Sequence, residues 1–208
     1  MRRWFASNQA EDLFKDTNKI EIGEVRTSPY NIRLPLRTED SSTIKLEFVA
    51  ENRFELLDSE KNIIPGLPML HLCDRFTSKL LANADRGMDS STYCRDLIDL
   101  SILRQEMPIP KDAIARAEAN YPVVKPLIEV LSQFKAKPEL RESCYKALLI
   151  DNPIKVIDGL NLILADYELP KIKRSFIETD FSYLDEEPTR KPQKSKAKKS
   201  SKSKDLEL

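Results

Sequence analysis

Apolar and polar residues alternate in the first quarter of the chain. The alternation is clear over residues 19–22 and again over 43–49, and it is typical of half-buried strands. Between these segments, a Ser-Pro-Tyr-Asn turn signal at 28–31 separates two extended runs. Pro35 in the second run favours a strand that lies at the edge of a sheet or ends there. Because no helix fits between these strands, we predict a small antiparallel meander.

The hydrophobic pattern becomes helical after Pro68. Leu72, Phe76 and Leu80 recur every four residues until Gly87, which predicts a helix that ends at the glycine. A cluster of Ser and Thr at 90–92 is predicted to cap the next helix, which runs from Tyr93 through Leu103 and is broken by Pro108 and Pro110. Further helices are expected over 111–121, 123–137, 138–150 and 153–166.

The order of strands first and helices second predicts an α+β fold. We expect a sheet region over 1–68, a helical region over 69–170, and a linker with a disordered tail over 171–208. The apolar share of 40% suffices for a core, and no apolar run approaches the length of a membrane helix. A membrane protein, a disulfide-rich secreted domain and a collagen-like fibre are therefore excluded.

Charge is distributed unevenly, although the formal net charge is zero. Residues 188–204 hold eight Lys and Arg side chains and no acid, and residues 1–187 are net negative by six. The Lys/Ser-rich tail contains too little apolar surface to fold by itself. It could tether the protein to nucleic acid or another anionic partner, or it could be only a solubilising end.

The cysteines and the single histidine favour structural roles. Cys73, Cys94 and Cys144 are widely spaced in apolar surroundings, which indicates reduced core residues rather than a disulfide framework. No apolar signal region follows the first residues, so we expect a cytoplasmic protein. His71 has no second histidine for a zinc site, and no P-loop or dinucleotide-binding motif occurs.

Charged residues within an apolar helix are the main candidates for chemistry. Asp96 and Asp99 lie three positions apart and share a side of this helix, next to Arg95. Buried carboxylates require cations, hydrogen-bond donors or a solvated cleft, and the preceding helix offers Lys79 as the matching cation. Asp85 and Arg86 at the end of that helix add another charged pair. The spacing alone leaves two interpretations open: a polar site between the helices, or an ion-pair network that only joins them.

These residues resemble a known family. A lysine helix, Asp-Arg-Gly at 85–87 and Arg-Asp-x-x-Asp-Leu at 95–100 are similar to the AbiEii/AbiGii nucleotidyltransferase toxins of type IV toxin–antitoxin and abortive-infection systems. The strands at 18–22, 30–33 and 45–53 are similar to the central sheet of that family. The resemblance covers about residues 15–170 and is most specific over 70–104. It implies a partial DNA-polymerase-β-like nucleotidyltransferase sheet followed by a helical bundle.

The resemblance also implies a reaction, cofactors and site residues. Family members transfer a nucleotide from an NTP onto an acceptor with Mg²⁺. By this resemblance Lys79, Arg86 and Arg95 are expected to bind the NTP. The candidate catalytic residues are Asp96, which helps to assemble the site, its neighbour Asp99, and Glu47 on a strand. No metal ligand is assigned in this chain.

One departure from the family changes the functional expectation. The superfamily uses a Gly-Ser turn that cradles phosphate and an Asp-x-Asp or Asp-x-Glu pair that holds the metal ions. The four glycines are each followed by Glu, Leu or Met, and no acid-x-acid triplet follows a glycine turn. We expect the family's first helix and first two strands to lie upstream of residue 1, and this chain to be inactive alone.

Two functional hypotheses follow. In the first, the chain is a nucleotidyltransferase toxin, or the C-terminal part of one. In the second, it is a non-catalytic interaction protein that binds an antitoxin or a separate catalytic half. A cognate antitoxin is the expected partner in both hypotheses, and nucleic acid is a further candidate partner for the basic tail.

Overall fold

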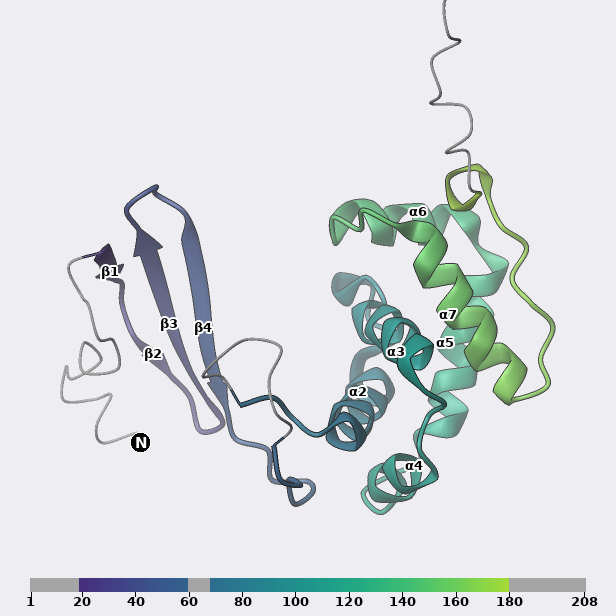
Figure 1. Cartoon of the computed structure of the whole chain (residues 1–208), viewed down its shortest axis with the longest axis horizontal. Coiled ribbons are helices and arrows are strands. Elements are labelled where there is room, and N and C mark those ends of the chain that lie inside the picture. The colour runs from purple at the N-terminus through teal and green to yellow at the C-terminus, as the bar shows by residue number, and fades with distance from the viewer. Residues whose placement is uncertain (1–18, 60–67, 180–208) are drawn as a thin grey trace, which may run out of the picture. The chain divides into compact units, whose positions relative to one another are not determined.

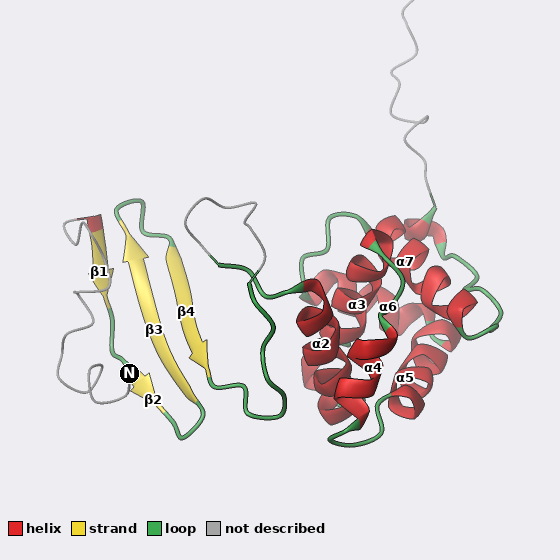
Figure 2. Cartoon of the chain, turned by 60° about the horizontal axis from the view of Figure 1, so that its bottom comes forward, coloured by secondary structure: helices red, strands yellow, loops and turns green. Residues whose placement is uncertain are grey.

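The computed structural model describes residues 19–59 and 68–179. Within these residues, four antiparallel strands precede six α-helices (Figures 1 and 2), which confirms the predicted α+β class. No helix there is long and apolar enough to cross a membrane. The basic segment at 188–204 lies outside the described residues, so its predicted disorder stays a prediction.

The sheet is built around its third strand. The strands are β1 (Ile20–Ile22), β2 (Arg26–Thr27), β3 (Asn31–Thr38) and β4 (Thr43–Val49). β1 and β2 pair with different parts of β3. β4 pairs with β3 along nearly the whole of β3, with Leu34 opposite Leu46. Figure 1 shows β3 between β1 and β4.

Pro35 does not mark an edge, and that expectation was wrong. β3 pairs on both sides, and Pro35 lies opposite Lys45 of β4. The Pro35 carbonyl accepts a hydrogen bond from the Gly23 amide (2.9 Å), so the backbone polar atoms of Pro35 face the gap between β1 and β2. Because the missing N–H of proline points to this gap, no hydrogen bond with β4 is lost. A side chain at Gly23 would meet the Pro35 ring at 2.9 Å.

Alternation gives the sheet two different faces. Ile32, Leu34 and Leu36 of β3 are buried, and apolar residues of the neighbouring strands pack against them. Charged residues that include Arg33, Lys45 and Glu47 lie at the alternate positions. The period-two alternation therefore separates an apolar face from a charged face.

The helical region follows the predicted order, and all six helices were expected. They are α2 (Leu72–Arg86), α3 (Arg95–Glu106), α4 (Lys111–Glu118), α5 (Val124–Ala136), α6 (Pro138–Ala147) and α7 (Pro153–Asp166). Pro138 and Pro153 occupy the first turns, where the missing N–H costs nothing. A stripe of four apolar residues on α5 is buried: Leu127, Val130, Leu131 and Phe134.

The start of α3 differs from the prediction. Residues Ser90–Thr92 form a separate 3₁₀ turn, η3, whose first amides are capped by Asp89. Tyr93 and Cys94 then adopt the left-handed conformation (φ 51° at both), and Cys94 is the N-cap residue that precedes α3. The Ser/Thr cluster therefore caps no α-helix, because two left-handed residues separate it from α3.

The described residues divide between two compact units, one within 1–84 and 110–125, the other within 85–109 and 126–179. In the first unit, Asp74 of α2 is fully buried and pairs with Arg116 of α4 (3.0 Å). Asp74 also accepts a hydrogen bond from the Leu57 amide (2.7 Å), and Arg116 lies over the Phe54 ring. These contacts join α2, α4 and the segment around Leu57.

In the second unit, α3 packs closely against α7. Gly159 of α7 faces the backbone of Ser101, and a Cβ atom at Gly159 would lie 1.9 Å from the Ser101 carbonyl oxygen. Arg104 forms a bidentate pair with Asp166 (2.6 and 2.8 Å), and the Gln105 side chain donates to the Lys155 carbonyl (2.9 Å). α3 is thus held on α7 by close backbone packing and by polar contacts.

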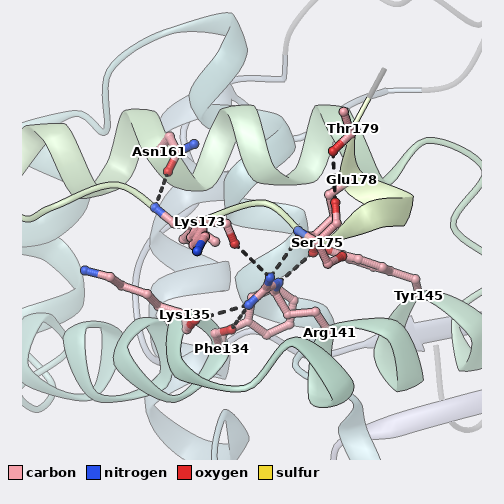
Figure 3. A network of polar contacts seen from close by, with 10 residues as sticks. Phe134, Lys135, Arg141, Tyr145, Asn161, Lys173, Ser175, Glu178 and Thr179 are labelled. Carbon is pink, nitrogen blue, oxygen red and sulfur yellow. Dashed lines mark hydrogen bonds and ion pairs between the residues drawn. The ribbon is translucent and has the colours of Figure 1, made fainter. Parts of the chain in front are cut away.

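The segment after α7 is tied to the second unit by a buried ion pair (Figure 3). Arg141 of α6 and Glu178 of η4 (Phe176–Glu178) are fully buried and form a bidentate pair at 2.6 and 2.9 Å. Arg141 also donates to three backbone carbonyls, and the Tyr145 hydroxyl donates to Glu178 (2.9 Å). Since both charges are hydrogen-bonded, the pair anchors this segment.

Candidate functional site

Asp96 and Arg86 form the centre of the candidate site. Asp96, in the first turn of α3, is 2% exposed, and both of its carboxylate oxygens accept from Arg86 at 2.7 and 3.1 Å. Arg86 is thus the partner that the buried carboxylate requires, in the place where the sequence led us to expect Lys79. The hydrogen bonds to Asp96 raise the pKa of the Arg86 guanidinium, although burial lowers it. The negative charges of Asp85 and Asp99 raise this pKa further.

The connection between α2 and α3 positions this pair. The Arg86 carbonyl accepts from the Asp89 amide (3.0 Å) and from the Thr92 hydroxyl (3.1 Å). Asp89 caps the Ser91 amide at 2.9 Å, which fixes the turn. The short turn therefore places the last residue of α2 opposite the first turn of α3.

Arg86 retains donors for a ligand. Its Nε and Nη2 atoms bind Asp96, which uses two of the five N–H donors of a guanidinium. The side chain is 39% exposed. A guanidinium that is fixed on one edge and accessible on the other is suited to bind phosphate oxygens.

The other predicted residues on these helices occupy different environments. Asp99 is half-buried on α3, one turn after Asp96. Arg95 is exposed at the first position of α3. Lys79 is half-buried on α2, seven residues before Arg86, a spacing that places both side chains on the same face of a helix.

Lys79 belongs to the first compact unit, and Arg86, Asp96 and Asp99 belong to the second. The structure therefore brings together Arg86 and Asp96, with the charge of Asp99 acting on Arg86. A joint site of Lys79 with the two aspartates stays a prediction.

Glu47 lies on β4, apart from the helical motif in the sequence. Its carboxylate accepts from Arg33 at 2.5 Å and pairs with Lys45 at 3.3 Å. These hydrogen bonds, first that of Arg33 and then that of Lys45, lower the pKa of Glu47. Glu47 is thus ionised and already paired with two cations on the charged face of the sheet.

The carboxylates do not assemble a magnesium site. Among residues 19–59 and 68–179, no group of three or more His, Cys, Asp or Glu side chains could hold a metal ion. Both oxygens of Asp96 bind Arg86, and Glu47 binds Arg33 and Lys45. Since Mg²⁺ requires free carboxylate oxygens, these residues do not fit the ion.

Asn83 of α2 is a residue that the sequence pattern did not single out. It is 1% exposed, and neither its amide nitrogen nor its amide oxygen has a hydrogen-bond partner among the described residues. It lies four residues after Lys79 and three before Arg86, on the same side of the helix. A buried amide without a partner costs about 1–3 kcal/mol. No sequence signal indicates Asn83, because its burial and its lack of partners are known only from the fold.

These features define the class of protein. A small antiparallel sheet precedes helices, and a buried aspartate orients an accessible arginine at the α2–α3 turn, within the Lys79 to Asp99 motif. The sheet followed by helices is the order that the resemblance to nucleotidyltransferase toxins implies.

The family model for nucleotidyl transferase AbiEii toxins of type IV toxin–antitoxin systems matches residues 1–190. The chain therefore belongs to the AbiEii nucleotidyltransferase toxin family. No curated protein and no solved structure gives a significant match.

Proposed function

We propose that this chain provides the triphosphate-binding part of a nucleotidyltransferase toxin. The bidentate Arg86–Asp96 pair carries the proposal, because it holds a partly exposed guanidinium inside the Lys79 to Asp99 motif, which resembles that of the family. In this proposal Arg86 and Lys79 contact the phosphates of an NTP. Arg95, which is exposed on the first turn of α3, gives additional positive charge.

The two aspartates act on the cations in this proposal. Asp96 fixes the orientation of Arg86, so that the guanidinium loses little side-chain freedom when a phosphate binds. Asp99 adds negative charge near Arg86 and keeps it protonated. Glu47 is kept as a candidate acidic residue of the catalytic sheet, although it would have to leave Arg33 and Lys45 first.

Nucleotide transfer by this chain alone is not expected. Mg²⁺ chemistry in the superfamily uses the Gly-Ser turn and an acidic pair, and these 208 residues contain no Gly-Ser dipeptide. Loss of one well-placed electrostatic group typically reduces the rate by about 10²–10³. We therefore propose that the chain binds NTP but transfers no nucleotide by itself.

Thermal melting tests the binding proposal. Each NTP with Mg²⁺ is added to the purified chain, and the ligand that fits raises the melting midpoint through preferential binding to the folded state. Lys79→Ala removes most of this shift, whereas Lys146→Ala, an exposed lysine on α6, leaves it intact. A shift that is equal in both variants contradicts the role of Lys79.

A second function follows from the missing catalytic motifs. A protein that retains the helical motif without the Gly-Ser turn and acidic pair is suited to bind an antitoxin or a separate polypeptide that carries those motifs. Co-expression with the neighbouring reading frames, followed by purification through this chain, tests the idea. Recovery of the chain without either polypeptide counts against it.

A further inference from the structure

Two arginines lie directly opposite each other on the charged face of the sheet. Arg26 of β2 pairs with Arg33 of β3 in the antiparallel register, so the two side chains leave the sheet on the same face. Like charges at directly opposite positions are unfavourable. β4 lies on the other side of β3 (Figure 1), and its Lys45, two residues before the residue that faces Arg33, adds a third cation to this face.

Nearby carboxylates neutralise these three cations only in part. Arg33 and Lys45 share one carboxylate, that of Glu47, at 2.5 and 3.3 Å. The pair of Arg26 with Glu24 is loose, at 3.5 Å, and these two side chains are 77% and 80% exposed. Exposed pairs of this kind contribute little, because water competes for both charges. Three cations therefore face two carboxylates, and the cluster keeps a positive charge.

The same side chains line a cavity of about 350 Å³. The lining consists of the three cations together with Glu24 and Pro35. A cavity of this size holds several water molecules, so a small anion fits in it with water around it. The positive charge of the cluster and the space to receive an anion thus occur at the same place on the sheet.

We propose that this cavity is a binding site for a phosphate group, formed by residues outside the α2–α3 motif. Arg26 and Arg33 approach it from neighbouring strands, and the paired N–H groups of a guanidinium match the oxygens of a phosphate. Arg33 donates to Glu47 through Nε, which uses one of the five N–H donors of its guanidinium. Lys45 adds a compact positive charge. A bound phosphate relieves the repulsion between the two arginines.

Glu47 competes with the phosphate for two of the three cations. Its carboxylate pairs with both Arg33 and Lys45, so a phosphate that binds these cations must displace it. Removal of the Glu47 charge should therefore strengthen phosphate binding, whereas removal of an arginine charge should weaken it. A carboxylate that served only to position Arg33 would have the opposite effect when it was removed.

Nuclear magnetic resonance of the full chain, with isotopically labelled nitrogen, tests the proposal and locates the site. Inorganic pyrophosphate is expected to shift the amide signals at Arg26, Arg33 and Lys45 in a saturable manner. Arg26→Gln and Arg33→Gln should each weaken this binding about tenfold, the effect of one lost charge-assisted hydrogen bond. Glu47→Gln should bind pyrophosphate more tightly than the wild type.

A second titration distinguishes two sources of the phosphate group. A short single-stranded oligonucleotide carries the same phosphate oxygens along a backbone. If it binds more tightly than pyrophosphate at the same amide signals, the site takes a nucleic-acid backbone. If it binds more weakly, the site takes a small phosphate ion.

Arg37→Gln is the matched control. Arg37 is an exposed arginine of β3 that pairs with Glu21 at 3.5 Å, the distance that also separates Arg26 from its glutamate. Among the described residues, Arg37 lies outside the lining of this cavity. The variant is therefore expected to bind pyrophosphate as the wild type does.

Two results would overturn the proposal. One is that neither pyrophosphate nor the oligonucleotide shifts the amide signals at Arg26, Arg33 and Lys45. The other is an equal loss of affinity in Arg26→Gln and Arg37→Gln, which would show that the face attracts anions through its general charge only. Both arginines are exposed, so these substitutions are expected to leave the fold intact.

Discussion

At the residue scale, the candidate site depends on how buried polar side chains find partners. Buried Asp96 needs a partner for its charge, and in the structure Arg86 provides it through two hydrogen bonds. Asn83, by contrast, is buried with no partner for its amide among the described residues. Paired and unpaired buried groups have opposite effects on stability, and this difference can be measured.

Asp96→Asn keeps the shape of the side chain and removes its charge. Because Arg86 is partly exposed, we expect a loss of about 1–3 kcal/mol in the free energy of unfolding, the range for a charge-assisted hydrogen bond. Urea unfolding at pH 7 measures it. Asp158→Asn is the matched control, since that exposed carboxylate on α7 pairs with exposed Arg174 and should cost less than about 1 kcal/mol. If the two variants lost the same free energy of unfolding, this would contradict the burial of the Asp96 carboxylate.

Asn83→Leu tests whether the unpaired amide is retained for a ligand. The substitution replaces it with an apolar group of similar shape, so we expect no loss of stability, or a gain of about 1 kcal/mol. The same variant should bind nucleotide more weakly if a ligand pairs with the amide. A stability loss above about 2 kcal/mol, measured by urea unfolding, would show that Asn83 has a structural partner.

At the scale of elements, α3 is the helix that carries the candidate aspartates. The second compact unit, to which α3 belongs, is stabilised by α7 and by the segment after α7 that includes η4. The contact of α3 with α7 depends on the absence of a side chain at Gly159. The segment after α7 is held by the buried Arg141–Glu178 pair, which is sensitive to pH.

Gly159→Ala should destabilise the second unit despite the better helix propensity of alanine. The new Cβ would meet the Ser101 carbonyl oxygen at 1.9 Å, so α3 and α7 must separate. Overpacking of this kind typically costs about 1–3 kcal/mol. Thermal unfolding should show a lower midpoint, and Leu162→Ala, at a partly exposed position of the same helix, should change it less. An unchanged midpoint for Gly159→Ala would be inconsistent with the close packing.

Glu178 should make stability depend on acid pH. Burial opposes its ionisation, but hydrogen bonds from Arg141, the Ser175 amide and Tyr145 outweigh burial and lower its pKa. A lowered folded-state pKa adds stability above the unfolded value of about 4.3, and this stability is lost as pH falls through the folded value.

Glu178→Gln should therefore reduce stability at pH 7, by about 3–5 kcal/mol for a broken buried pair, and flatten the dependence of the melting midpoint on pH below about 4.5. Melting curves from pH 7 to pH 3 measure both effects. A variant whose midpoint falls with acid as steeply as the wild type would exclude Glu178 as the responsible group.

At the scale of the whole molecule, hydrophobic periodicity predicted the class and the order of the elements, because burial of one face determines both strands and helices. It did not predict that Pro35 sits in a central strand, since this depends on which side of β3 the gap between β1 and β2 faces. It also missed the left-handed pair Tyr93 and Cys94, which tertiary contacts enforce.

The candidate site was predictable in part. The motif contains both residues of the Arg86–Asp96 pair, but the prediction matched the aspartates with Lys79. The motif also did not indicate Asn83, because an amide without partners is visible only once burial is known. Nor could spacing relate Lys79 to Asp96, since this depends on how the two compact units are arranged.

The central claim is that the α2–α3 motif recognises a triphosphate. Isothermal titration calorimetry of the full chain with each NTP, in the presence of Mg²⁺, tests it directly when compared with the matching nucleoside. We predict that the preferred NTP binds at least about tenfold more tightly than its nucleoside, a difference of about 1.4 kcal/mol. Arg86→Ala and Lys79→Ala should abolish that difference, and Lys146→Ala should preserve it. Equal affinity for nucleoside and NTP, or a preference that survives both substitutions, would contradict the claim.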